Sequence, residues 1–388
     1  MVERGNKFGY KMLKINRFFQ KKFYVRFNVL TIILLLLGLT FIILYVADEN
    51  RCESAKEIEM DKIKYRLIIL ILTHPDAMRN RDTIRKTWLS DKHQNVKHLF
   101  AIGTFDLQPE QMDTLQSEKH KYNDLLLLAK LEDSYGTLTK KVLISLKEIY
   151  ATYEFDFLLK CDDDSLVLVH KVLRELDKWE MKGTKKELYW GYFNGKAQVK
   201  KRGPWKEHDW NLCDYYLPYA VGGGYVLSSN LIKFIAGSAD VLRLYNSEDV
   251  SVGLWLAPLA NVERKHDVRF DTEYLSRGCS NVYIITHKQS VESMTNLYDH
   301  YRSAGVLCAR ESRNRMSYNY NWTVPPSQCC TRQIGRDLRE GKIGESQTFK
   351  NRPTIDHKKR EHPVYLEQRS KVSHFFSIKK KTQEPKRT

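Results

Sequence analysis

The stretch Phe155–Asp164 reads FDFLLKCDDD and sets the organisation of the chain around it. Its first half, Phe155–Leu159, is largely apolar and predicts a buried strand, and three consecutive carboxylates follow soon after it. Adjacent carboxylates repel one another, and a bound cation is the simplest relief of that repulsion. Oxygen ligands favour Mg²⁺ or Mn²⁺, which commonly bridge to substrate phosphates. We therefore expect a metal–diphosphate site at the carboxyl end of this strand, against the alternative of an acidic turn.

Strands and helices alternate on the N-terminal side of this stretch. The continuous apolar run Tyr65–Leu72 is typical of a strand buried in a parallel sheet. Other predicted elements are strands at Lys97–Ile102 and Asp124–Leu128, and helices at about 80–89, 109–121 and 137–152. Such alternation predicts an α/β protein with a parallel sheet. Residues 65–330 are enough for one sizeable domain or for two merged halves.

An apolar run covers residues 29–47 and is interrupted only by Thr31, Gly38 and Thr40. At about 1.5 Å per residue, it is long enough to cross a bilayer core. Residues 1–28 carry eight Lys/Arg and one Glu, which predicts a cytoplasmic tail because positive flanks stay inside. We expect a type II membrane protein with a signal anchor at 29–47, a stem at 48–64 and a lumenal catalytic domain at 65–330.

The net charge of +17 suggests a nucleic-acid partner until it is located along the chain. Residues 1–28 contribute +7 and residues 331–388 contribute +9, which leaves only +1 for residues 29–330. A nearly neutral folded part argues against nucleic-acid binding. The basic segment 331–388 has weak apolar periodicity and is predicted to be a disordered tail, with contact to an acidic polysaccharide or a membrane as the alternative.

Seven cysteines occur without a CxxC pair, so a structural zinc site is not expected. A lumenal setting permits disulfides, and the five cysteines from Cys213 onward are the candidates, with their pairing left open. Asn321-Trp322-Thr323 is an N-glycosylation sequon on the side of the membrane where modification occurs.

Two further patterns carry both a functional and a structural interpretation. Arg81 and Arg85 share one face of a predicted helix, where forked donors could bind phosphate or a uracil edge, or form a solvated basic face. Gly222–Gly224 lie between aromatic residues. Glycine allows close backbone approach to a ligand and aromatic rings support sugars, whereas the structural alternative is a plain turn before a strand.

Three single residues also have both a structural and a functional interpretation. Glu248 and Asp249 follow Ser247, so they suit the capped first turn of a helix, and one of them could instead act as a general base. His287 ends an apolar run and is either a packed histidine or a metal ligand. A site of mixed carboxylate and imidazole ligands would favour Mn²⁺ over Mg²⁺.

Together these segments resemble the β1,3-glycosyltransferases of glycosyltransferase family 31. Residues 81–88 (RDTIRKTW) fit the motif RxxIRxTW, and residues 133–141 are similar to DxYxNLTxK with Thr137 in place of asparagine. Residues 160–164 fit KxDDD, and Glu248-Asp249-Val250 begins the motif EDVxxG. The likeness is to the linker-region galactosyltransferases in particular, and the further stretches that carry it are 189–193, 212–219, 266–274, 277–281, 286–290 and 325–330.

The resemblance implies a GT-A fold, in which a Rossmann-like mixed sheet is flanked by helices, and UDP-galactose as the donor. It implies an inverting transfer to the galactose of galactosyl-β1,4-xylose on proteoglycan core proteins, in the Golgi and in complexes with other Golgi glycosyltransferases. Two alternatives stay open: a family 31 transferase with another donor, such as UDP-N-acetylglucosamine, and a lectin-like protein with vestigial motifs.

The resemblance also assigns roles to particular residues. Asp164 and His287 would hold Mn²⁺ (or Mg²⁺), Asp162 and Asp163 would face the ribose and the metal-bound waters, and Asp249 would be the base. The remaining donor contacts would come from Arg81, Arg85 and Lys160, and the acceptor or sugar contacts from Trp190, Tyr219, Gly222, Gly223, Gly224 and Glu248.

Overall fold

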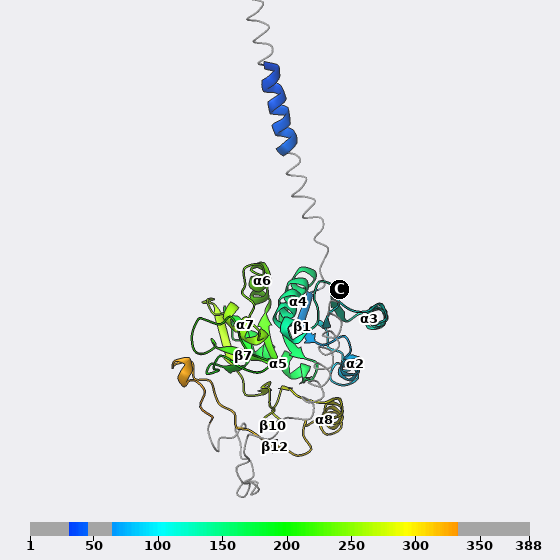
Figure 1. Cartoon of the computed structure of the whole chain (residues 1–388), viewed down its shortest axis with the longest axis vertical. Coiled ribbons are helices and arrows are strands. Elements are labelled where there is room, and N and C mark those ends of the chain that lie inside the picture. The colour runs from blue at the N-terminus through cyan, green and yellow to red at the C-terminus, as the bar shows by residue number, and fades with distance from the viewer. Residues whose placement is uncertain (1–30, 46–63, 333–388) are drawn as a thin grey trace, which may run out of the picture. The chain divides into compact units, whose positions relative to one another are not determined.

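The computed structural model describes residues 31–45 and 64–332. The expected cytoplasmic tail, most of the stem and nearly all of the C-terminal tail lie outside these residues. Residues 31–45 form a helix (Figure 1). Its apolar side chains are exposed. Within the described ranges, no helix combines the length and the apolar character needed to cross a membrane. The signal anchor at 29–47 therefore stays a prediction.

A seven-stranded sheet forms the centre of the domain, and four of its six neighbouring strand pairs are parallel. In spatial order the strands are β3 (Leu125–Leu128), β2 (Val96–Gly103), β1 (Lys64–Leu72), β4 (Glu154–Asp162), β7 (Tyr219–Ser228), β6 (Glu187–Asn194) and β8 (Val262–His266). The predicted α/β class with a mostly parallel sheet is confirmed. The antiparallel strand β7 separates the two parallel parts.

The four predicted strands form as β1, β2, β3 and β4. Residues 67–71 of β1 are completely buried, as expected for a strand covered on both faces. β1 pairs in parallel with β4, and Leu72 is opposite Asp162 at the carboxyl ends of the two strands. The three carboxylates therefore begin in the last residue of a central strand and continue beyond it.

Helices α4 (Leu138–Thr152), α6 (Ser229–Gly237) and α7 (Glu248–Trp255) cover one face of the sheet. Their apolar residues, such as Val142, Ile232 and Val252, share one buried cluster with alternate residues of the strands. Figure 1 shows α4 and α6 next to each other on this side. The predicted helix at 137–152 is confirmed, and its stripe of Leu146 and Ile149 is buried.

The opposite face is covered by α5 (Val169–Glu180), whose Trp179 ring lies 5.9 Å from that of Phe157 on β4. The remaining helices are α2 (Met78–Lys86), α3 (Pro109–Tyr122) and α8 (Val291–Ala304). Helices α2 and α3 confirm the predicted ones, and α2 packs against α8. In α8, the Ser290 hydroxyl accepts the N–H of Ser293 as the N-cap, and Gly305 ends the helix with a positive φ of 72°.

Short elements complete the domain and bring distant residues to the end of β4. A three-stranded sheet contains β5 (Leu166–Val167), β11 (Ile285–Thr286) and β9 (Phe270–Asp271). β10 (Gly278–Cys279) pairs with β12 (Ser312–Arg313), and single 3₁₀ turns lie at Tyr135–Thr137 and Pro326–Gln328. Because β11 pairs with β5, which follows the carboxylates in the chain, His287 is brought to them.

The disulfides use four of the five candidate cysteines. Cys279 pairs with Cys308, and Cys329 with its neighbour Cys330. Cys213 is an exposed free thiol, and Cys161 is free and buried in β4.

Candidate active site and metal site

Three side chains from two segments converge at the carboxyl end of β4. Asp162 and Asp164 come from the acidic run, and His287 follows β11. One ligand atom from each lies within 4.8 Å of the other two. Two carboxylates and an imidazole at this spacing form a donor set suited to a divalent cation, and the imidazole favours Mn²⁺ over Mg²⁺. The sequence placed His287 in this role only through the family resemblance.

The hydrogen bonds of His287 test whether these residues fit a metal ion. Its Nδ1 atom lies 3.1 Å from the backbone carbonyl of Glu273, which can only accept a hydrogen bond, so Nδ1 carries the proton. The Nε2 lone pair then faces Oδ1 of Asp164 at 2.9 Å and Oδ2 of Asp162 at 3.4 Å. A lone pair that faces two carboxylates requires either a proton or a metal ion between them. The residues therefore fit a divalent cation.

The electrostatics of the site agree with this geometry. Burial disfavours the charged imidazole, but Asp164 and Asp162 outweigh it and raise the pKa of His287 to about 9. Burial acts against the charge of Asp164, and the neighbouring His287 nevertheless holds the pKa of that carboxyl below its usual range. The site is thus built to attract positive charge.

Asp163 has different surroundings from its two neighbours. Its Oδ2 accepts a hydrogen bond of 2.6 Å from the hydroxyl of Thr73, just beyond β1. Burial raises the pKa of Asp163 to about 6, and the charges of Asp164 and Asp162 add to that effect. Within the described residues, Asp163 is not one of the three converging side chains.

Lys160 connects the acidic run to the start of α7. Its ammonium group is fully buried and donates to Oδ1 of Asp162 at 2.9 Å, to the carbonyl of Gly222 at 2.7 Å and to Oε1 of Glu248 at 2.5 Å. The hydroxyl of Tyr225 donates to the other oxygen of Glu248 at 2.9 Å. All three ammonium protons have protein acceptors, so this placement favours a positioning role for Lys160 over donor binding.

Glu248 and Asp249 begin α7 and differ in exposure. Glu248 is buried, and burial raises its pKa to about 7 against the opposing charge of Lys160. Asp249 is half-buried, and its Oδ2 and Oδ1 accept the N–H groups of Gly222 at 2.9 Å and Val250 at 2.8 Å. Burial raises the pKa of Asp249, although those N–H donors and Lys160 oppose the shift. Ser247 occupies the N-cap position, but its side chain makes no capping hydrogen bond, contrary to expectation.

The three glycines lie inside β7, so the alternative of a plain turn before a strand is wrong. A Cβ atom on Gly222 would lie 2.7 Å from Oε1 of Glu248, and one on Gly223 would lie 2.5 Å from Nδ1 of His287. Real side chains do not tolerate such contacts. The close approach predicted for this segment therefore brings the backbone against the charged residues of the site itself. A Cβ atom on Gly224 would lie 3.1 Å from Cδ1 of Ile285, which is tighter than ordinary van der Waals contact, and 3.5 Å from Cγ2 of Thr272.

Arg81 and Arg85 are joined through Glu118 on α3. Arg81 is fully buried and binds Glu118 through two hydrogen bonds of 2.7–2.8 Å. Arg85 binds Glu118 at 2.7 Å and Asp124 at 2.8 Å. The expectation of a solvated basic face is wrong, because these guanidinium groups are turned inward to protein carboxylates. Their contact with a donor nucleotide stays a prediction that this geometry does not favour.

Trp190 and Tyr219 are mostly enclosed. Trp190 is fully buried, its indole N–H donates to Asp267 at 3.0 Å, and its ring packs on that of Phe270. Such a ring has no face left for a sugar, which favours a packing role. Tyr219 is 8% exposed and packs with Tyr216.

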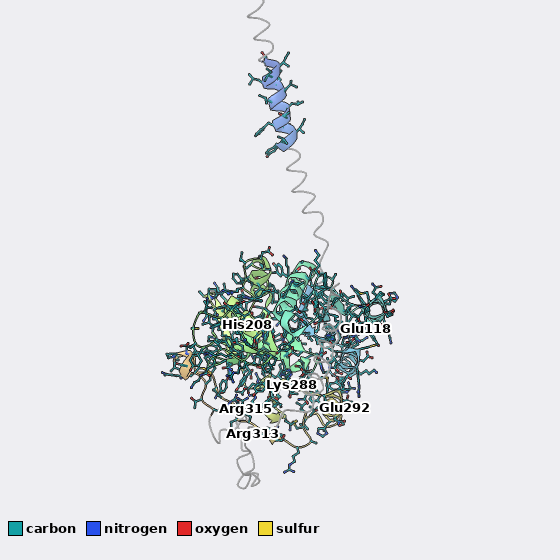
Figure 2. The ribbon with its side chains drawn as sticks, in the orientation of Figure 1. Glu118, His208, Lys288, Glu292, Arg313 and Arg315 are labelled. Atoms are coloured by element: carbon teal, nitrogen blue, oxygen red, sulfur yellow. A yellow bond between two sulfur atoms is a disulfide. The ribbon has the colours of Figure 1, made fainter. Side chains whose placement is uncertain are left out.

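Two residues that contact the metal-binding side chains were not predicted from the sequence as part of the site. The backbone carbonyl of Glu273 accepts a hydrogen bond from Nδ1–H of His287, and no sequence pattern reveals this contact. Lys288, labelled in Figure 2, donates to Oδ2 of Asp164 at 3.0 Å and has a positive φ of 62°. The feature of the sequence that could have identified Lys288 as a site residue is its position directly after His287.

The predicted glycosylation residue lies at the surface. Asn321 is exposed, and its Oδ1 accepts the hydroxyl of Thr323 at 2.8 Å. Glycosylation of Asn321 stays a prediction.

The chain is similar to known glycosyltransferases. Residues 79–268 match the family model described as galactosyltransferase. Beta-1,3-galactosyltransferase 6 of Mus musculus is 44% identical over 293 residues, which cover 74% of this chain and 90% of the relative. Hydroxyproline O-galactosyltransferase GALT2 of Arabidopsis thaliana is 30% identical over 63% of this chain and 36% of its own length. UDP-GalNAc:beta-1,3-N-acetylgalactosaminyltransferase 2 of Xenopus laevis is 25% identical over 55% of this chain and 44% of its own.

Proposed function

The chain belongs to the galactosyltransferase family and is a glycosyltransferase, and on that premise we propose that it transfers galactose from UDP-galactose in an inverting β1,3 reaction. The proposed acceptor is the terminal galactose of galactosyl-β1,4-xylose on proteoglycan core proteins, and the proposed architecture is the GT-A fold. The observation that carries the proposal is the convergence of Asp162, Asp164 and His287 at the carboxyl end of β4.

The proposed metal is Mn²⁺, held by Asp164 and His287 with Asp162 beside them. When bound, such an ion stabilises the negative charge that develops on a diphosphate leaving group. Lys288 is placed to add positive charge at the same point, since its ammonium already lies 3.0 Å from Asp164. Lys160 and Thr73 hold Asp162 and Asp163 in place, which leaves their orientation independent of the substrate.

Asp249 is the proposed base. Its carboxylate is half-buried and fixed by the N–H groups of Gly222 and Val250, so the side chain is oriented before a substrate binds. A raised pKa makes a carboxylate a stronger base, and the burial of Asp249 acts in that direction. Asp249 would take the proton of the acceptor 3-hydroxyl while the oxygen of that hydroxyl attacks the anomeric carbon of the donor galactose. The bond between this carbon and UDP breaks in the same step, UDP leaves from the opposite face, and the configuration at the carbon is inverted.

We also propose a Golgi location, with the catalytic domain in the lumen. The apolar run at 29–47 and the basic residues before it support a type II orientation. Two cysteine pairs in the described domain fit an oxidising compartment. The proposed partners are the UDP-sugar, the proteoglycan acceptor, the membrane and other Golgi glycosyltransferases.

The test is transfer by the full-length chain, purified in detergent, from UDP-galactose to a galactosyl-β1,4-xyloside. Product should form with Mn²⁺ and disappear with a chelator, and linkage analysis should give β1,3. A panel that adds UDP-N-acetylgalactosamine and UDP-N-acetylglucosamine tests the donor, because one similar protein is named for UDP-GalNAc. Absence of turnover with every donor would favour the lectin-like alternative.

A further inference from the structure

Three aromatic rings from separate segments meet at the surface of the domain. The ring centroid of Trp205 lies 6.4 Å from that of Tyr135 and 5.9 Å from that of Tyr274, and both contacts are edge-to-face. Tyr135 is 47% exposed, Tyr274 is 57% exposed and Trp205 is half-buried. Burial of apolar surface does not account for such exposed rings. We call Tyr135, Trp205 and Tyr274 the aromatic platform.

The first ring is held at the metal-binding side of the site. Tyr274 directly follows Glu273, whose carbonyl accepts the Nδ1 proton of His287 at 3.1 Å. The segment before it also lies against β7, since a Cβ atom on Gly223 would meet the carbonyl of Thr272 at 2.7 Å. The position of Tyr274 is thus tied to that of His287.

The second ring is held at the proposed base. The carbonyls of Pro204 and Lys206, on either side of Trp205, accept hydrogen bonds from the side-chain amide of Asn246 at 2.9 and 3.1 Å. Glu207 accepts the backbone N–H of Asn246 at 2.9 Å. Asn246 lies three residues before Asp249 in the chain, so these bonds fix the Trp205 segment next to the start of α7.

The third ring is connected to the acidic run. Tyr135 lies two residues after Asp133, whose carboxylate accepts a hydrogen bond of 2.6 Å from Lys141. Lys141 also donates to the carbonyl of Thr73, and the hydroxyl of Thr73 donates to Asp163. The platform therefore joins three segments, each anchored to a different part of the same site.

The site offers two kinds of chemistry to its two substrates. Asp162, Asp164, His287 and Lys288 form a charged part suited to a metal and a diphosphate. The aromatic platform offers exposed rings, and rings of this kind bind the C–H faces of sugars. A galactosyl-xylose acceptor is neutral and does not require the charged part for binding, whereas the diphosphate of the donor does. The acceptor is therefore the substrate that matches the exposed rings.

We propose that Trp205, Tyr274 and Tyr135 bind the acceptor glycan and hold its terminal galactose at Asp249. This inference rests on the proposed function, because it assigns a binding surface to the acceptor of that reaction. Trp205 lies between the other two rings and contacts both, so its removal should disrupt the whole platform.

The experiment uses the full-length chain and the variants Trp205→Ala, Tyr274→Ala and Trp205→Phe. The matched control is Trp322→Ala, which removes a 43% exposed tryptophan that stacks on Tyr320. Trp205→Ala should raise the KM for a galactosyl-β1,4-xyloside on the order of tenfold, with the KM for UDP-galactose unchanged. Tyr274→Ala should act in the same direction with less risk to folding, and Trp205→Phe should restore most of the acceptor affinity.

Direct binding separates a failure of this inference from a failure of the proposed function. Saturation-transfer NMR with the xyloside, in the presence of UDP and Mn²⁺, reports acceptor contact without turnover. If wild type transfers galactose and both alanine variants keep its acceptor KM and NMR signal, the platform is wrong and the proposed function stands. If wild type transfers no galactose, the proposed function fails, and loss of the NMR signal in Trp205→Ala still upholds glycan binding by these rings. An equal loss in Trp322→Ala would overturn the assignment.

Discussion

Nε2 of His287 lies 2.9 Å from Oδ1 of Asp164, although the two residues come from different segments of the chain. β11 aligns with β5 and carries His287 back to the acidic run at the end of β4. The Glu273 carbonyl fixes the ring, so that the lone pair of Nε2 is directed at the carboxylates. Both side chains are therefore positioned to bind the same metal ion.

His287→Ala and Asp164→Ala should each abolish the Mn²⁺-dependent part of UDP binding, because each removes one of only three converging ligand side chains found among the described residues. Isothermal titration of UDP with and without Mn²⁺ measures that part. His170→Ala is the control, since this exposed histidine on α5 bonds to Tyr301 and is not among the three. Unchanged metal-dependent binding in His287→Ala would rule out ligation by the imidazole.

Gly223→Ala should weaken the same metal dependence without removing any ligand. The new methyl group would lie 2.5 Å from Nδ1 of His287 and 2.7 Å from the carbonyl of Thr272, so the ring must move. The expected loss in the free energy of unfolding is about 1–3 kcal/mol, measured by urea denaturation.

Gly237→Ala is the matched control for this substitution. A Cβ atom at Gly237, at the end of α6, meets no atom within 4 Å. Its stability should stay at or slightly above that of wild type, with normal Mn²⁺ dependence. Equal behaviour of the two variants would mean that close packing at Gly223 does not position His287.

Lys160→Met should lower the free energy of unfolding by about 3–5 kcal/mol, because it leaves the buried Glu248 without its cation. Glu248→Gln in the same chain should recover part of that loss, since the remaining carboxamide is neutral. The coupling between the two substitutions, measured by urea denaturation, reports the Lys160–Glu248 interaction. Additive losses would show that the 2.5 Å contact contributes nothing to stability.

Part of this structure could be predicted from the chain alone. β1 and β4 are apolar runs whose strand character is local, and the carboxylates follow β4 directly. β7 pairs with β4 and β6 through contacts between segments that are distant in the chain, so no local sequence pattern predicts this pairing. For the same reason the partner of Arg81 was missed: Glu118 lies on another helix and looks like an ordinary surface residue in the sequence. The run of acidic residues therefore predicted where the site lies. Whether a charged residue lies at the site or forms an internal ion pair depends on tertiary contacts that the sequence does not reveal.

Glu175 gives a test of pH dependence away from the metal ligands. The hydrogen bond from Arg269, at 3.0 Å, is the main cause that lowers the pKa of Glu175 to about 2. A lowered carboxyl pKa means that the stabilisation is complete above the unfolded pKa, near 4.5, and is lost as pH falls toward 2. Its full size is roughly 3 kcal/mol at neutral pH.

The measurement is urea denaturation of wild type and Glu175→Gln at pH 7 and pH 3.5. The difference between them should shrink by roughly 1 kcal/mol at the lower pH, since the unfolded glutamate is then mostly protonated. A difference that stays constant between the two pH values would show that the ion pair with Arg269 does not set this pKa.

Asp249→Asn separates proton chemistry from donor binding. The asparagine keeps the size of the side chain but cannot take a proton, so transfer should fall by about 10²–10⁴. Metal-dependent UDP binding should stay near wild type, because Asp249 is not among the three converging ligand residues.

The substitution is expected to lower stability somewhat. The amide NH₂ must face the N–H of either Gly222 or Val250, where the aspartate accepted a hydrogen bond from each. A thermal melt therefore accompanies the assay, and UDP affinity serves as the measure of an intact site. Asp240→Asn, at a 95% exposed carboxylate, is the control and should transfer normally. Turnover near that of the control in a folded Asp249→Asn variant would remove Asp249 from the role of base and leave Glu248, the other carboxylate of the first turn, as the group to test.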